Sequence, residues 1–229
     1  MLLNECINQN SILIIANGPS INKFIFGEYI DQFSSIARIN NFVIDGFESF
    51  IGSKTDFWCN GANQNLEKKE NIFDRIIVFI PPTIQNRKGT AIHDRIQKRL
   101  GLDIDSYELI SEKDMITFEN QCGSKRLTTG TNSILWAMKH FEKVVIHGFD
   151  FFQNGKEHYF DGGIKSWFFN QSWFKKGTKH NHKQEKKYIL ELLKKKFTIK
   201  RQIKTAKNSN VNLGTLFIML KNTFWYSVI

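Results

Sequence analysis

Short apolar runs alternate with longer polar segments along the first 150 residues. Runs of strand length occur at 11–16 (SILIIA), 35–39, 55–59, 75–80 (RIIVFI) and 107–110. Between them, the pattern predicts a helix from Ser20 to about Phe33 and a polar helix over 91–100 that ends at Gly101. Strands that alternate with helices predict an α/β domain with a mostly parallel sheet.

The stretch from Arg126 to Asp161 is the most informative part of the chain. A turn of small residues at 128–130 precedes a helix with apolar side chains at helical spacing: Ile134, Leu135, Met138 and Phe141. The apolar run 144–146 then predicts a buried strand that ends at Gly148 and Asp150. Ligands of open α/β sheets bind at the carboxyl ends of strands, so this stretch predicts a binding site.

Four predicted strands end in a side chain that is rich in hydrogen-bonding groups. These side chains are Asn17, Asn40, Asn60 and Asp150. A single asparagine after a strand is usually a turn residue. Four such residues at matching places predict one shared site, in which amides bind a base, a ribose and a phosphate without charge.

The length of 229 residues suits one large domain. We expect a nucleotide-binding domain over 1–210 with a small lid around 152–180, because 167–179 is aromatic and basic without clear periodicity. Asn181–Lys196 predicts a lysine-rich helix, and Thr198–Ile203 predicts a last strand.

The net charge of +10 is concentrated in one segment. Residues 175–207 hold 13 Lys and Arg against Glu185 and Glu191, a local balance of +11, so the rest of the chain is near neutrality. Such a patch fits a nucleic-acid footprint, a surface for anionic lipid, or a solvated helix face. All three interpretations stay open at this point.

An apolar segment, 211–229, follows the basic one and carries Trp225 and Tyr226 near its end. Lys221 and Asn222 interrupt it, and no unbroken run approaches the ~20 residues that span a bilayer. A basic stretch before an aromatic, apolar segment is typical of a membrane-interface anchor. A last helix that packs on the domain is the alternative interpretation.

Cysteine and aspartate patterns give no sign of a metal site. The three cysteines, Cys6, Cys59 and Cys122, are odd in number and show no CxxC spacing, which favours a reducing cytoplasm. No basic and apolar leader is apparent in residues 1–10, so no signal peptide is predicted. Asp103 and Asp105 form an Asp-x-Asp pattern, but Gly101 and Leu102 precede it as in an ordinary turn, so we interpret the two aspartates as structural. We therefore expect a cytoplasmic, metal-independent protein, peripheral on the inner membrane if 211–229 is an anchor.

Six short motifs stand in order between about residues 11 and 203. They are Ile15–Ser20 (IANGPS), Arg38-Ile39-Asn40, Thr128-Thr129-Gly130, Gly148–Phe151 (GFDF), His158–Asp161 (HYFD), and His180 five positions before Glu185. In this order and spacing they resemble the CMP-sialic-acid-dependent sialyltransferases. The similarity is to the bacterial lipooligosaccharide enzymes and, in the short motifs, to the animal-type enzymes. It implies a single Rossmann-like nucleotide-binding domain, a variant of the glycosyltransferase-A-like fold.

The resemblance assigns the donor contacts to the turns that follow the strands. By this resemblance, the donor-binding residues are Asn17 and Gly18 at the CMP phosphate, Asn40, Asn41 and Asn60 at the nucleotide sugar, Thr128, Thr129 and Gly130 at the sugar carboxylate, and Gly148 and Asp150 at cytosine and ribose. No cofactor and no metal are implied.

The resemblance assigns the general base to His180, and an unperturbed imidazole pKa of ~6.5 suits that task. Glu185 could fix the imidazole tautomer if the chain folds back. We expect instead that His180 precedes a helix with Glu185 in its first turn, because an i,i+5 pair does not face squarely on one helix. Bacterial relatives place a tyrosine where this chain has Phe152, so the contact with the leaving phosphate is assigned to His158 and Tyr159.

The predicted function is inverting transfer of sialic acid from CMP-sialic acid to a galactose-terminated glycan, lipid-linked and of lipooligosaccharide or capsule type. Transfer of another CMP-activated acidic sugar, such as Kdo, is a close alternative. A dehydrogenase or methyltransferase would need a GxGxxG turn, which NGPS is not. A nucleic-acid-binding protein would need aromatics among its lysines, and 183–196 offers only Tyr188, so no nucleic-acid partner is expected.

Overall fold

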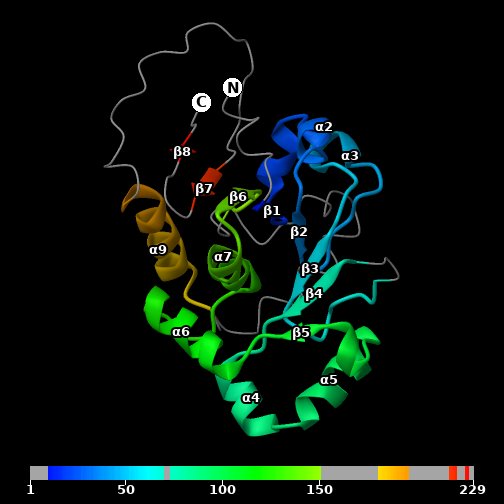
Figure 1. The fold of residues 1–229 in the computed structure, drawn as a ribbon, viewed down its shortest axis with the longest axis vertical. Coiled ribbons are helices and arrows are strands. Elements are labelled where there is room, and N and C mark those ends of the chain that lie inside the picture. Colours follow the sequence, from blue (N-terminus) through cyan, green and yellow to red (C-terminus); the bar gives the residue numbers. More distant parts are fainter. Residues whose placement is uncertain (1–9, 70–72, 151–179, 196–216, 221–224, 227–229) are drawn as a thin grey trace, which may run out of the picture.

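In the part of the chain that the computed structural model describes, eight strands form one sheet in the order β5-β4-β3-β2-β1-β6-β7-β8 (Figure 1). The structure describes residues 10–69, 73–150, 180–195, 217–220 and 225–226. The strands are β1 (Ser11–Ile15), β2 (Ile36–Ile39), β3 (Phe57–Asn60), β4 (Arg75–Val78), β5 (Glu108–Leu109), β6 (Lys143–His147), β7 (Phe217–Leu220) and β8 (Trp225–Tyr226). The neighbours from β5 to β6 pair in parallel, so the predicted mostly parallel α/β sheet is confirmed.

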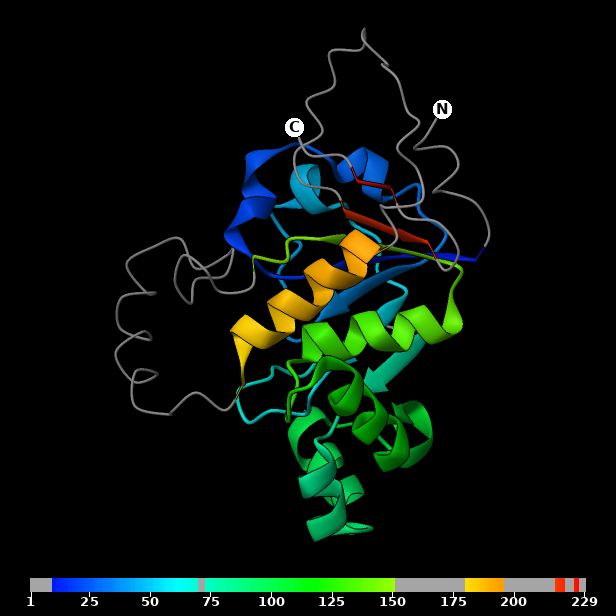
Figure 2. The same cartoon turned by 90° about the vertical axis from the view of Figure 1, so that its left-hand side faces the viewer.

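Helices cover both faces of this sheet. They are η1 (Pro19–Lys23), α2 (Gly27–Ile30), α3 (Glu48–Ile51), α4 (Pro82–Lys88), α5 (Ala91–Leu100), η2 (Ile104–Ser106), α6 (Glu112–Cys122), α7 (Thr129–His140) and α9 (His182–Lys195). Figures 1 and 2 show α6, α7 and α9 together on one face, and their side chains share one core cluster with the strands. On the other face, η1, α2 and α3 pack over β1 and β2, while α5 packs over β3 and β4.

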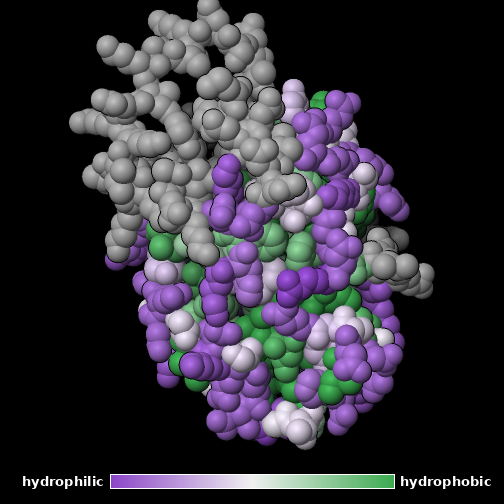
Figure 3. All heavy atoms as spheres, viewed as in Figure 1, coloured by the Kyte–Doolittle hydropathy of each residue, from purple (hydrophilic) through white to green (hydrophobic). Residues whose placement is uncertain are grey.

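Side chains of the inner strands alternate between these two faces, as in any strand. In β1, Ile12 and Ile14 pack with α7, whereas Leu13 and Ile15 pack with η1 and α2. Every residue of β1 is buried because both faces are covered, which explains its unbroken apolar run. Where Figure 3 colours the surface, hydrophilic residues dominate, as expected when most large apolar side chains lie in the three core clusters.

The predicted helix over 20–33 is wrong, because η1 and α2 take its place with an extended residue, Phe24, at the end of η1. The backbone N–H of Ser20 donates to the Asp150 carboxylate, and the Ser20 side chain caps no helix. A Cβ on Gly27 would lie 1.9 Å from the Glu48 carbonyl oxygen. The close packing of α2 on α3 therefore decides the path of this segment, which local helical spacing does not reveal.

The described residues of the tail form two short strands, which neither interpretation of its sequence predicted. Phe217–Leu220 pairs antiparallel with β6, and Trp225–Tyr226 pairs with Phe217 and Ile218. This part of 211–229 therefore extends the sheet at the β6 edge. The strand expected at 198–203 lies outside the described residues.

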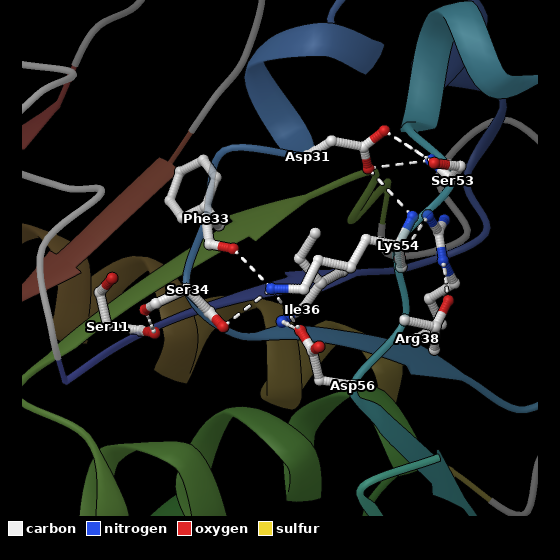
Figure 4. A network of polar contacts seen from close by, with 10 residues as sticks. Ser11, Asp31, Phe33, Ser34, Ile36, Arg38, Ser53, Lys54 and Asp56 are labelled. Atoms are coloured by element: carbon white, nitrogen blue, oxygen red, sulfur yellow. Dashed lines mark hydrogen bonds and ion pairs between the residues drawn. The ribbon is translucent and has the colours of Figure 1, made fainter. Parts of the chain in front are cut away.

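A network of polar contacts ties the loops before β2 and β3 together (Figure 4). The Arg38 guanidinium is buried and donates to the carbonyl oxygens of Ile51 and Gly52 at 2.8 and 3.0 Å. Asp31 accepts from the backbone N–H groups of Ser53 and Lys54. Burial alone would raise the pKa of the Asp31 carboxyl, but these hydrogen bonds hold the pKa below its ordinary value of 3.8. Arg38, although part of a sequence motif, thus supports the fold.

Candidate active site

The candidate site lies where β6, β1, β2 and β3 end. These four strands are neighbours in the sheet and run in parallel, so the loops that follow them meet at one edge. The strand order reverses at the β1–β6 pair, and such a reversal is the usual ligand-binding point of open α/β sheets. The loops carry the polar residues singled out from the sequence: Asn17 after β1, Asn40 and Asn41 after β2, Asn60 at the end of β3, and Asp150 after β6.

Asn17 joins the turn after β1 to the turn after β2. Its side-chain amino group donates to the carbonyl oxygens of Ile39 at 2.9 Å and Asn41 at 2.6 Å. Because both partners are acceptors, both N–H groups of the amide are used and only its oxygen remains. In this arrangement the Asn17 side chain has no donor left for a phosphate.

Two glycines bring the turns after β1 and β6 into contact. The Gly18 N–H donates to the Gly148 carbonyl at 2.9 Å, and a Cβ on Gly18 would lie 2.6 Å from the Asp150 carboxyl carbon. Gly148 has a φ of +71°, which only glycine adopts readily. Asp150 accepts from the Ser20 N–H at 2.9 Å and so anchors η1. The contacts among Gly18, Ser20, Gly148 and Asp150 hold the two turns together, and we call this group of residues the β1–β6 joint.

Asn40 and Asn41 hold the loop that follows β3. Asn40, with a left-handed φ of 52°, accepts from the Gly61 N–H through its side-chain oxygen at 3.3 Å. The Asn41 side chain donates to the Asn65 carbonyl and accepts from the Glu67 N–H, both at 2.9 Å. Both asparagines therefore order the 61–67 loop beside the candidate site.

Asn60 is fully buried, and its side-chain oxygen accepts from the Ala62 N–H at 3.1 Å. Its amino group has no hydrogen-bond partner among the residues that the structure describes. An unsatisfied buried donor costs roughly 1–3 kcal/mol and calls for an explanation, of which a ligand contact is one. Asn60 is therefore the strand-end amide with the clearest unused donor.

The amino end of α7 adjoins these loops, because α7 runs antiparallel to the strand β6 that it precedes. Thr128 caps the helix, and its hydroxyl oxygen accepts from the Thr131 N–H at 3.3 Å. The first N–H groups of a helix, here those of Thr129 and Gly130, have no partner within the helix and attract anions. A Cβ on Gly61 would lie 3.1 Å from the Thr129 hydroxyl, so the helix start borders the loop after β3.

His180 lies just before α9, and Glu185 lies in the first turn of that helix. The His180 Nδ1 is 2.5 Å from the Arg126 carbonyl oxygen, which can only accept, so Nδ1 carries the proton. The neutral ring then has its lone pair on Nε2, as a general base requires.

Glu185 does not contact the imidazole of His180 in any interaction of the described residues; its carboxylate accepts from the Thr128 N–H at 3.0 Å and the Thr128 hydroxyl at 2.6 Å. The tautomer of His180 is thus fixed by a backbone carbonyl, a partner that sequence reasoning missed.

Several predicted site residues lie outside the described part of the chain. His158, Tyr159, Phe152 and most of the expected lid at 152–180 lie outside. Within the described ranges, no group of three or more His, Cys, Asp or Glu side chains is placed to hold a metal ion. None of the helices in those same ranges has the length and apolar character to cross a membrane.

Comparison with known proteins identifies the family. A sequence profile described as glycosyltransferase family 29 (sialyltransferase) matches residues 8–77 and 95–197. Among solved structures, a mammalian sialyltransferase is similar with a TM-score of 0.58 and 16% identity, over 81% of this chain and 66% of that one. A mammalian sialyltransferase bound to Gal-beta-1-3GalNAc-ortho-nitrophenol gives a TM-score of 0.56 and 15% identity with the same coverage. A search of curated protein sequences finds no match.

The structural similarity confirms the expected fold class, a Rossmann-like domain of the glycosyltransferase-A-like type. This chain spans slightly less than two thirds of the mammalian chains that it resembles. The profile match covers well over half of the chain and includes the loops after β1, β2, β3 and β6, as well as His180 and Glu185. The chain therefore belongs to glycosyltransferase family 29, the sialyltransferases.

Proposed function

We propose that the protein transfers sialic acid from CMP-sialic acid to a galactose-terminated glycan, with inversion and without a metal ion. One observation carries this proposal beyond family membership. The free amino end of α7 and the Nε2 of His180 belong to segments that are bonded to each other at 126–128 and 180–185. This bonding supports a shared site, in which the proposed anion site at α7 and the proposed base lie together at the ligand-binding edge of the sheet.

The donor's carboxylate would bind at the start of α7. The Thr129 and Gly130 N–H groups and the Thr129 hydroxyl are the proposed donors, because the Thr128 hydroxyl is engaged by Glu185. The absence of a side chain at Gly130 lets the start of α7 pack closely on Phe149, because a Cβ there would lie 3.0 Å from the Phe149 ring. Asn60, with its unused amino group, is the proposed side-chain donor to the nucleotide sugar.

The remaining donor contacts are proposed for the turns at the β1–β6 joint and after β2. Asn17, Gly18, Gly148 and Asp150 would surround the CMP moiety mainly through backbone groups, because their side chains or close packing hold the joint together. Asn40 and Asn41 would act by ordering the 61–67 loop.

The chemical step is a displacement at the anomeric carbon. The acceptor hydroxyl oxygen bonds to that carbon as the bond to the CMP phosphate oxygen breaks, and CMP leaves with the electron pair. The hydroxyl proton moves to Nε2 of His180. His158 and Tyr159 are proposed to stabilise the charge on the leaving phosphate, as hydrogen-bond donors do in place of a cation.

A ligand panel tests this proposal. CMP and CMP-sialic acid are expected to raise the unfolding temperature, whereas NAD and S-adenosylmethionine are expected to leave it unchanged. A ligand at a hundredfold excess over Kd stabilises a folded protein by ~2.7 kcal/mol. Stabilisation by CMP-Kdo that exceeds that by CMP-sialic acid would reassign the sugar.

Transfer to a soluble lactoside is expected to persist in excess EDTA. Loss of transfer on chelation, with recovery in Mg²⁺ or Mn²⁺, would contradict the metal-free step.

We also propose that the basic segment 175–207 binds an anionic membrane surface, where a lipid-linked acceptor is presented. The local balance of +11 supports this interpretation. Deletion of 211–229 is a poor test because it removes β7 and β8 and uncovers the edge of β6. Charge substitutions leave these strands in place and are the better experiment.

Changing Lys194, Lys195 and Lys196 together to glutamine is expected to weaken binding to phosphatidylglycerol vesicles. Each lysine near such a surface contributes ~1 kcal/mol, so three together amount to about 100-fold at low salt. Vesicle co-sedimentation measures the change, and transfer to a soluble lactoside is expected to stay near wild type. The matched control changes the exposed Lys88, Lys98 and Lys113, which lie in α4, α5 and α6, to glutamine. Equal losses in both triple variants would show that only net charge matters.

A further inference from the structure

The segments 126–128 and 180–185 are joined at two points that lie side by side. His180 Nδ1 donates to the Arg126 carbonyl at 2.5 Å, and the Glu185 carboxylate accepts from both the N–H and the hydroxyl of Thr128. The six residues from His180 to Glu185 therefore span from the proposed base to the cap of α7. Nearby, the Gln184 side chain donates to the Cys122 carbonyl at 2.9 Å and fixes α9 on α6.

We propose that Glu185 is a positioning residue that sets the start of α7 for the carboxylate of the donor sugar. In this proposal the 180–185 segment is a two-point clamp, which keeps the general base and the carboxylate site in one fixed relation. The inference rests on the proposed function, since it assigns a role within that site. It differs from the role that the sequence analysis considered but did not favour for Glu185, the orientation of the His180 ring.

The burial of Glu185 supports this role. Its side chain is only 1% exposed, and removing a carboxylate from water is unfavourable unless strong hydrogen bonds compensate. Both groups that donate to Oε2 belong to Thr128, whereas Oε1 has no hydrogen-bond partner among the described residues. Hydrogen bonds to an ionised acceptor are roughly twice as strong as neutral ones. The contacts that hold the buried charge are therefore those that hold Thr128.

The Thr128 hydroxyl has one proton and two lone pairs. The proton is donated to Glu185, one lone pair accepts from the Thr131 N–H, and the Thr131 hydroxyl lies 3.2 Å away. This arrangement holds Thr128 in the extended conformation of a helix cap, with φ −62° and ψ 155°. The N–H groups of Thr129 and Gly130, which come next, then keep a fixed direction toward the donor's carboxylate.

A comparison of CMP with the whole donor tests the inference, because CMP lacks the sugar carboxylate. The Glu185→Gln variant is expected to bind a slowly reacting 3-fluoro analogue of CMP-sialic acid at least ~10-fold more weakly than wild type, because both hydrogen bonds that Oε2 accepts from Thr128 lose their charge assistance. Its Kd for CMP is expected to stay within about twofold. Isothermal titration measures both constants. Glu191→Gln, at a half-exposed position of the same helix that pairs with Lys187 at 4.0 Å, is the matched control and should change neither.

Variants at Thr128 make the test independent of how well Glu185→Gln folds. Thr128→Ser keeps the hydroxyl and is expected to bind the analogue like wild type, whereas Thr128→Val should lose analogue binding selectively. Adding Glu185→Gln to Thr128→Val should then cause no further loss. Equal weakening of CMP and the analogue, or no change in either, would overturn the positioning role. A wild-type protein that binds neither ligand would instead overturn the proposed function.

Discussion

Replacing His180 with alanine is expected to lower the rate of sugar transfer at least ~10²-fold, the lower range for a positioned general base. CMP affinity is expected to stay close to wild type, because the base acts only when the acceptor proton moves. The hydrogen bond from Nδ1 to the Arg126 carbonyl leaves Nε2 as the basic nitrogen. Steady-state transfer to a lactoside and titration with CMP measure the two effects.

Two further variants separate the base from its surroundings. His180→Asn keeps a side-chain N–H that can donate to the Arg126 carbonyl but has no basic nitrogen, so it is expected to be as inactive as His180→Ala. His182→Ala is expected to have a mild effect, although the two imidazole rings lie only 5.8 Å apart. An inactive His182→Ala beside an active His180→Ala would move the base to His182. An active His180→Asn would mean that the Arg126 contact, and not proton transfer, is the contribution of His180.

The second large effect is expected at Gly148, where alanine should destabilise the fold by about 3 kcal/mol and abolish CMP binding. The φ of Gly148 is +71°, and a Cβ there would lie 2.5 Å from the Ile21 side chain and 2.8 Å from the Ala16 carbonyl oxygen. The Ile21 side chain can rotate, but the Ala16 carbonyl is backbone at the end of β1. The turn at Asn17 and Gly18 would therefore have to move.

Gly89 provides the control that isolates the close approach. It also has a positive φ, +50°, but no atom lies within 4 Å of its Cβ position. Gly89→Ala is expected to cost about 1–2 kcal/mol, from backbone strain alone, and to leave CMP binding intact. Urea unfolding gives both stabilities, and titration gives both affinities. Similar losses of stability and similar CMP affinities in the two variants would mean that the joint between the β1 and β6 turns tolerates a side chain.

The alternation of apolar and polar segments was sufficient to predict the layered α/β fold. Strands buried on both faces need unbroken apolar runs, and the run at 11–16 became the fully buried β1, while the run at 75–80 contains β4, whose last two residues are buried. Gly101 ends α5 in the left-handed conformation that its sequence position predicts. Because parallel strands all end at the same edge, the sequence also placed Asn17, Asn40 and Asn60 at that edge.

The use of each donor and acceptor at that edge was not predictable. The side-chain amide of Asn17 donates both of its N–H groups to backbone carbonyls at the end of β2 and in the turn after it, more than twenty positions away. The helix predicted from Ser20 fails because α2 packs so closely on α3 that Gly27 meets the Glu48 carbonyl. In both cases the partner is a backbone group from elsewhere in the chain. Because every residue carries a backbone carbonyl, the pattern of side chains does not show which carbonyl becomes the partner.

Sequence by itself determined the family, the type of fold, and the placement of His180 before a helix with Glu185 in its first turn. Only the tertiary structure decided which partners these two side chains take. The bond from His180 to Arg126 spans 54 positions, and the bond from Glu185 to Thr128 spans 57. Hydrogen bonds of that range depend on where α9 packs against α6 and α7. Such packing is the sum of many weak contacts, which no local spacing of residues encodes.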